Sequence, residues 1–148
     1  MSTVSRVMRA TPDQVWEVLS DGWLYPLWVV GASRMREVDD TWPKEGSKLH
    51  HSVGSWPLLI NDDTEVLESQ PPGRLVLSAR AWPGGEARVV MHVEARGGET
   101  TVTIAEDVVS GPGKLMPAPL RLPLLTWRNT ETMRRLAFLV ERRHHSGS

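Results

Sequence analysis

The chain has 148 residues, of which 40% are hydrophobic and 24% charged, with a formal net charge of -1 and no cysteine. The apolar content suffices for a buried core and excludes intrinsic disorder. The near-neutral charge argues against a general nucleic-acid binder, whose affinity comes from neutralising phosphates. The lack of cysteine excludes disulfide scaffolds, thiolate zinc sites and cysteine nucleophiles. No apolar run approaches the roughly 18 residues of a membrane span, and residues 1–6 are not typical of the apolar core of a signal peptide. We therefore expect one cytoplasmic domain over residues 1–148, without stable membrane insertion.

The first elements are a strand and two short helices. Residues 2–9 are typical of a short strand. Thr11 can then cap a helix, Pro12 suits its first position, and Gln14 lies three residues past the cap, as a capping box requires. A second short helix is expected over residues 23–28.

The middle of the chain is a succession of strands. Clusters of glycine, proline and aspartate mark turns at short, regular intervals. Such spacing predicts an antiparallel meander rather than strands that alternate with helices. The expected strands cover residues 32–38, 46–53, 58–68, 74–82, 86–95 and 100–109.

A long helix is expected at the C-terminal end. Pro117, Pro119 and Pro123 predict an irregular stretch before it, and the helical period runs over residues 124–143. Residues 144–148 are expected to fray. The apolar face of this helix comprises Leu125, Asn129, Met133, Leu136, Ala137 and Val140, and the other faces carry most of the charged residues, Arg128 among them.

This order of elements predicts an α+β fold in which a seven-stranded, curved antiparallel sheet wraps around the long C-terminal helix. Two short helices follow the first strand. Because side chains do not always fill the space inside such a wrapped sheet, we expect a cavity between helix and sheet.

Several motifs resemble the START-like, helix-grip superfamily, also called SRPBCC, and most closely its polyketide cyclase/dehydrase and lipid-transport group. They are Thr11-Pro12-Asp13-Gln14-Val15-Trp16-Glu17-Val18-Leu19-Ser20-Asp21, Trp28 after Pro26, Gly46, Pro71-Pro72-Gly73-Arg74-Leu75, Gly98 to Val102 and Gly111-Pro112. The resemblance spans nearly the whole chain. It implies an apolar or amphipathic ligand in the cavity. It does not imply one activity, because the superfamily holds carriers, receptors, cyclases and chaperone activators.

Glu106 is the first candidate for chemistry. It shares a strand face with Val102, Ile104 and Val108, and this apolar company indicates that the face points inward. A carboxyl group in such a lining would be a proton donor or a ligand anchor, since burial favours its neutral form. The alternative is that Glu106 lies near the end of the sheet and is solvated.

His51 is the second candidate. It shares a face with Leu49 and Val53, so it is expected inside, where it could donate to a ligand or act as a general base. The alternative is a histidine whose ring is satisfied by a neighbour. His50 faces the other side of the strand, so the two histidines cannot bind one metal ion without distortion.

Asn129 is the polar break in the inward face of the long helix. It could bind a carbonyl or hydroxyl group of a ligand, or hydrogen-bond internally to the sheet. The expected ligand-binding residues are Trp28, Met35, His51, Met91, Ile104, Glu106, Asn129, Met133 and Leu136.

Three functions follow. The first is binding of a small hydrophobic ligand such as a lipid, an isoprenoid or a polyketide. The second is a polyketide cyclase, aromatase or dehydratase, in which Glu106 or His51 would shuttle protons and Asn129 would stabilise an enolate. The third is a protein-interaction module of the chaperone-activator type. The sequence leaves open whether the protein is an enzyme.

Charge is unevenly distributed along the chain. Residues 37–68 carry a net charge of -6 and residues 128–143 one of +3. This asymmetry and a Trp127 that does not align with the inward face favour the interaction module, although solvated faces also explain the charges. There is no phosphate loop, dinucleotide fingerprint or metal-binding helix motif, so we expect no cofactor, no metal and no nucleic-acid partner. A monomer or a homodimer is expected.

Overall fold

The structure is a computed structural model that describes residues 2–29, 32–53, 60–81 and 85–145. Side chains are described there except at residues 32–36, 51–53, 60–62, 81 and 143–145. The elements in chain order are β1 (Ser2–Met8), α1 (Pro12–Leu19), the 3₁₀ helix η1 (Gly22–Leu24), α2 (Tyr25–Trp28), β2 (Ala32–Val38), β3 (Lys48–Val53), β4 (Ile60–Gln70), β5 (Arg74–Ala81), β6 (Gly85–Arg96), β7 (Glu99–Ser110), the 3₁₀ helix η2 (Pro112–Leu115) and α3 (Ala118–His145).

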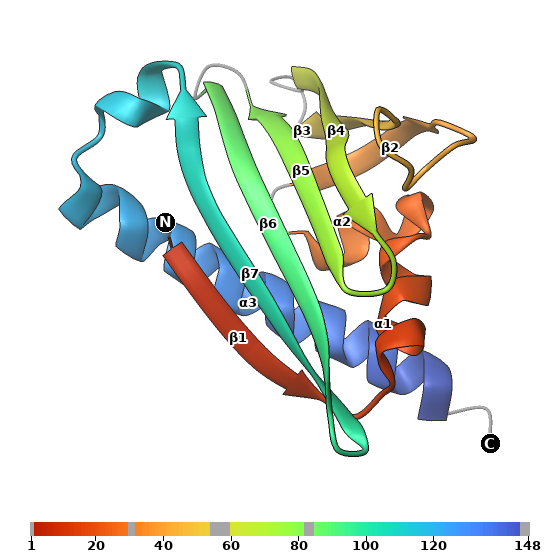
Figure 1. The fold of residues 1–148 in the computed structure, drawn as a ribbon. Helices are drawn as coiled ribbons and strands as arrows, with labels where there is room; N and C mark the ends of the chain where they lie inside the picture. The colour runs from red at the N-terminus through yellow and green to blue at the C-terminus, as the bar shows by residue number, and fades with distance from the viewer. Residues whose placement is uncertain (1, 30–31, 54–59, 82–84, 146–148) are drawn as a thin grey trace.

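Seven strands of the described residues form one antiparallel sheet in the order β1-β7-β6-β5-β4-β3-β2. Strands β2 to β7 pair with their neighbours in the chain, and β1 joins the open side of β7. The sheet curves, and α1, α2 and α3 lie on the same side of it (Figure 1). The predicted α+β fold is confirmed, with the long helix crossing the inner face of the sheet.

The capping box predicted for α1 is present. The Thr11 hydroxyl accepts from the Gln14 amide at 3.2 Å, and the Gln14 side-chain oxygen accepts from the Thr11 amide at 2.9 Å. Both groups satisfy backbone donors that a helix start would otherwise leave open. The start of α1, and with it the path of the chain away from β1, is thus encoded locally.

Helix α3 begins six residues before the predicted start, and the irregular stretch predicted there is wrong. Pro119 lies in the first turn, where amides have no acceptor within the helix, so its missing N–H costs nothing. Pro123 lies inside the helix and removes one hydrogen bond. Arg121 holds this segment in place: its Nε donates to Asp107 Oδ1 on β7 at 2.8 Å, and its Nη1 donates to the Met116 carbonyl at 2.8 Å.

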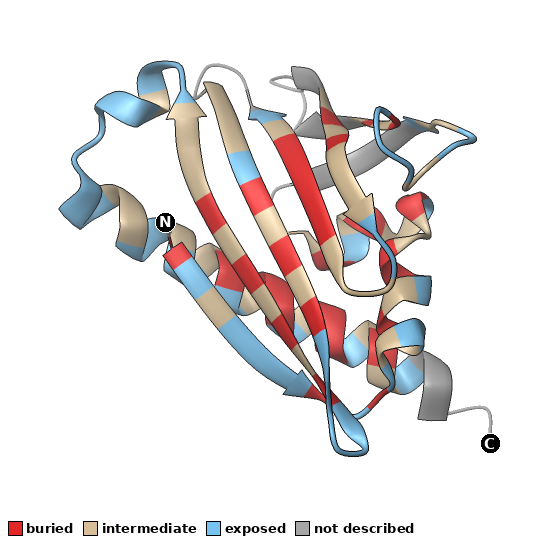
Figure 2. Cartoon of the chain, in the orientation of Figure 1, coloured by how far each residue is buried: buried red, intermediate tan, exposed pale blue. Residues whose placement is uncertain are grey.

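The core lies between the inner face of the sheet and the helices. Buried residues alternate with half-buried ones along β6 and β7 (Figure 2). The pairing of β6 with β7 is regular from the pair Val89–Glu106 to the pair Arg96–Glu99. The irregularity in the register lies outside this stretch, between Glu86 and Ala87. Alternation along β7 therefore predicts its inward side chains correctly.

Candidate functional site

Glu106 lies on the buried side of β7, in line with Val102 and Ile104. Its backbone pairs with Ser2 on one side and Val89 on the other. Only 1% of its surface is exposed. The inward orientation that alternation predicts is confirmed, and the solvated alternative is wrong. A glutamate this deeply buried requires a partner.

Two adjacent residues of α3 supply that partner. Arg128 Nη2 donates to both carboxylate oxygens of Glu106, 2.5 Å from Oε2, and Asn129 Nδ2 donates to Oε1 at 3.0 Å. The arginine side chain is 36% exposed and that of the glutamate 2%. The ion pair thus runs from the edge of the molecule to its interior, and Asn129 makes the internal bond to the sheet that was one of its two expected states.

The sequence analysis missed Arg128 and placed it on the outer faces of the helix. The structure turns its side chain toward β7 instead. A signal was available in the sequence, because Arg128 lies three residues after Leu125, which belongs to the predicted apolar face. Residues three apart share one side of a helix, so position 128 borders the inward face.

Tyr25 on α2 is a second polar group that the sequence analysis missed. Its side chain is buried, and its hydroxyl lies 3.2 Å from Thr64 Oγ1 on β4. Burial raises the pKa of Tyr25, and the hydrogen bond with Thr64 lowers it. The charge of Glu106 raises it and that of Arg128 lowers it, and all these effects together leave the pKa above its ordinary value. The phenol therefore stays neutral at physiological pH and can donate a hydrogen bond.

We call Glu106, Arg128, Asn129, Tyr25 and Thr64 the buried polar cluster. Electrostatic interaction of Tyr25 with Glu106 and Arg128 links its two parts. Two buried N–H groups have no hydrogen-bond acceptor among the described residues: Nε of Arg128, within the cluster, and Nε1 of Trp28, whose ring packs on Tyr25. An unpaired buried donor costs about 1–3 kcal/mol. The interior thus offers hydrogen-bond donors that no described residue accepts.

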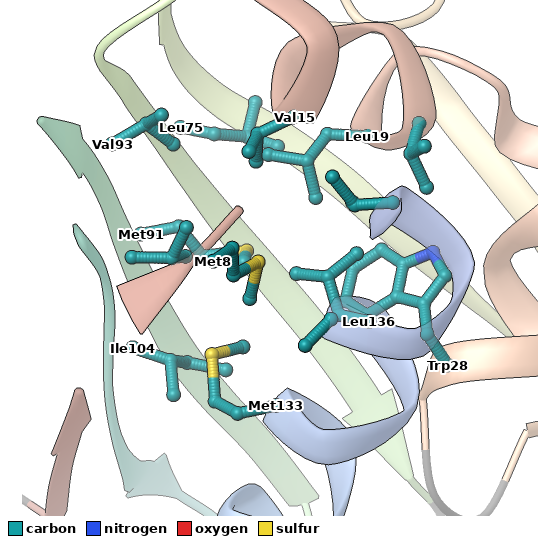
Figure 3. Packing of buried hydrophobic residues seen from close by; sticks show 14 of the residues in the cluster. Met8, Val15, Leu19, Trp28, Leu75, Met91, Val93, Ile104, Met133 and Leu136 are labelled. Carbon is teal, nitrogen blue, oxygen red and sulfur yellow. The ribbon is translucent and has the colours of Figure 1, made fainter. Parts of the chain in front are cut away.

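Buried apolar side chains lie next to this cluster: Ile104 is in line with Glu106 on β7, and Trp28 packs on Tyr25. The predicted residues Trp28, Met91, Ile104, Met133 and Leu136 all belong to one packed core, and we call these five the apolar lining (Figure 3). None is more than 3% exposed. Trp28 also packs edge-to-face on Tyr25, with ring centroids 5.3 Å apart. A guest molecule therefore fits beside the lining only when side chains of the lining shift. Methionine side chains change conformation most easily among these residues.

Two predicted residues lie outside the described side chains. Met35 and His51 face each other in the backbone register of β2 and β3, and their predicted roles stay predictions. The neighbouring His50 is described: its Nε2 lies 3.3 Å from Asp39 Oδ1.

The described residues give no sign of a metal centre or a membrane span. No three histidine, aspartate or glutamate side chains among them gather closely enough to hold a metal ion. Within the same part of the chain, no helix is both long and apolar enough to cross a membrane.

Comparison with known proteins gives the family and the fold. Among solved structures, protein NE0264 from Nitrosomonas europaea superposes with a TM-score of 0.72 at 16% identity, covering 97% of this chain and 95% of that one. A protein from Rhodobacter sphaeroides gives 0.69 at 23% identity, covering 93% and 90%. DynU16, a putative protein in the dynemicin biosynthetic locus, gives 0.66 at 23% identity, covering 94% of this chain and 46% of its own.

These likenesses establish the fold alone, since all lie below 25% identity. No curated protein matches. Residues 2–141 match the sequence model of the family described as "Polyketide cyclase / dehydrase and lipid transport". The match covers nearly the whole chain and agrees with the resemblance seen in its motifs. The chain belongs to the polyketide cyclase/dehydrase and lipid transport family.

Proposed function

We propose that the protein binds a small hydrophobic or amphipathic molecule between the inner face of the sheet and α3. The polar end of the molecule lies at the buried polar cluster, and its apolar body lies against the apolar lining. The observation that carries this proposal is the burial of Glu106 among apolar side chains, with its cation at the molecular edge. Apolar residues of similar size often stabilise a protein interior as well as a buried ion pair does. Stability alone therefore does not explain why a charged pair occupies this position.

The chemistry of the cluster favours a ligand with acceptor oxygens. Glu106 is already bonded to Arg128 and Asn129, whereas Trp28 Nε1 and Arg128 Nε, which have no acceptor in the described part of the chain, are both donors. A carboxylate, phenolate or ketone oxygen would satisfy a donor that is otherwise left open. Burial of the apolar body supplies the driving force, at about 25 cal/mol per Å² of apolar surface.

The test is native mass spectrometry of freshly purified protein, followed by organic extraction and titration with a fluorescent fatty acid. We expect a discrete added mass that is lost on denaturation, or saturable fatty-acid binding that is tighter than binding of the matched alkylamine. Met133→Phe enlarges a lining residue and should abolish binding, whereas Phe138→Met, on the exposed side of α3, should not. An apo mass together with no saturable binding would refute the proposal.

A second candidate function is proton transfer on a poly-β-keto chain, as in a cyclase or dehydratase. The convergence of Glu106, Tyr25 and Arg128 favours it, because one apolar interior then holds a carboxylate, a neutral phenol and a cation. The donors would stabilise an enolate and Glu106 would take up a proton. Unchanged turnover of a poly-β-keto substrate by Glu106→Gln would eliminate this role.

A further inference from the structure

Large apolar side chains are exposed where α3 begins. They are Leu115, Met116, Leu120, Leu124 and Trp127, with exposed fractions of 86%, 41%, 62%, 58% and 70%. We call these five residues the α3 ridge. The segment that carries them extends past the edge of the sheet formed by β1 and β7 (Figure 1), and Figure 2 shows most of it as exposed.

The three ridge residues on α3 follow the helical repeat, whereas Leu115 and Met116 precede this helix. Leu120, Leu124 and Trp127 are spaced by four and three residues, so they form one stripe on α3. Asn129 and Met133 lie on the opposite, buried side of the same helix. Packing against the sheet therefore does not explain the stripe. Contiguous exposed apolar residues of this kind mark an interaction surface.

The charge around the ridge identifies the kind of partner. Residues 111–145 contain seven lysines and arginines against two glutamates. The ion pairs of Arg121 with Asp107 and of Arg128 with Glu106 offset two of these charges, which leaves the segment with an excess of three positive charges. The side chains of Lys114 and Arg134 are exposed on this segment. A symmetric dimer through the ridge would bring two such basic segments together, because each copy presents the same patch to the other. An anionic surface would instead gain from both the charges and the apolar side chains.

We propose that the α3 ridge docks on the surface of an anionic lipid bilayer. Leucine and tryptophan projecting from a helix, next to basic residues, are the combination that binds at a bilayer interface without spanning it. The ridge inserts its apolar side chains at the level of the headgroups, and the exposed Lys114 contacts the lipid charges. This inference does not depend on what binds between the sheet and α3.

The experiment is co-sedimentation of the full chain with vesicles of phosphatidylcholine alone and of phosphatidylcholine mixed with phosphatidylserine. We expect binding to the mixed vesicles that weakens as salt is raised. Trp127→Ser should lower the partition coefficient about tenfold, which is the effect of losing one buried large apolar side chain. Lys114→Gln should lower it about fivefold.

Trp23→Ser is the matched control, since Trp23 is also an exposed tryptophan but lies on η1 rather than on α3. It should leave vesicle binding unchanged. Equal losses for Trp23→Ser and Trp127→Ser, or no binding to the mixed vesicles, would overturn the proposal and assign the ridge to a protein partner. Light scattering that shows a dimer dissociated by Trp127→Ser would also overturn it, because the ridge would then bind a second copy.

Discussion

The ion pair between Glu106 and Arg128 gives the sharpest prediction about stability. Arg128→Leu removes the cation and leaves a carboxylate of which 2% is exposed. Breaking a buried pair in this way costs about 3–5 kcal/mol, with the lower end expected here because Asn129 still donates to the carboxylate. Glu106→Gln should cost only about 1–2 kcal/mol. Its amide oxygen still accepts from Asn129, and the 36% exposed side chain of Arg128 can turn to water.

The double variant separates this account from simple loss of packing. Adding Glu106→Gln to Arg128→Leu removes the stranded charge, so the double variant should be more stable than Arg128→Leu alone by about 2–3 kcal/mol. The assay is urea unfolding followed by circular dichroism, with free energies from linear extrapolation. If Glu106→Gln destabilises as much as Arg128→Leu, or if the double variant is no more stable than Arg128→Leu, the carboxylate is not buried as described.

Three further predictions concern the fold that positions the site. Leu136→Ala should lower the free energy of unfolding by about 2–5 kcal/mol because Leu136 is fully buried, and a change below about 1 kcal/mol in urea unfolding would contradict its place in the core. Gly85→Ala should give a protein that is insoluble or that shows no folded signal in circular dichroism. The added Cβ would lie 2.1 Å from the Ser110 carbonyl oxygen, at a φ of +102°. A folded variant with an unchanged thermal midpoint would refute that packing. Burial acts to raise the pKa of Asp107, but hydrogen bonds from Arg121 and the Val108 amide outweigh it and hold the pKa below its ordinary value of 3.8. The ion pair therefore stabilises the fold above pH 3.8, and this stabilisation is lost as the pH falls through the lowered pKa. In urea titrations, Asp107→Asn should be less stable than wild type at pH 7 and nearly as stable as wild type at low pH. A difference in stability that does not change with pH would count against the ion pair.

Much of the fold could be predicted because its signals are local. The capping box fixes the start of α1, turn residues separate the strands, and alternation identifies the inward face of β7 wherever the register is unbroken. The early start of α3 could not be predicted in this way. Its first turns owe their helical state to tertiary contacts, above all from Arg121 to Asp107, which outweigh the signal of three prolines.

The candidate site could be predicted only in part. Glu106 and Asn129 stood out because each is a polar residue in an apolar repeat. Arg128 and Tyr25 did not stand out, because an arginine at the border of a helix face and a tyrosine in a short helix are equally compatible with the surface. Only the packing of α3 and α2 on the sheet shows that both side chains turn inward.

The central claim, that the space between the sheet and α3 admits a ligand, is tested most directly by thiol reactivity. The chain has no cysteine, so Met133→Cys introduces a single probe at a lining position that is 1% exposed. Leu75→Cys is the matched control: Leu75 is equally buried, and in Figure 3 it lies toward the end of the cluster that holds Val15 and Leu19.

We predict that Met133→Cys reacts with a thiol reagent faster than global unfolding allows, and that a fluorescent fatty acid slows the reaction. Leu75→Cys should react only as fast as the protein unfolds, with or without the fatty acid. If both variants react at the rate of global unfolding and the fatty acid changes neither rate, the space does not open and the proposed ligand site is wrong.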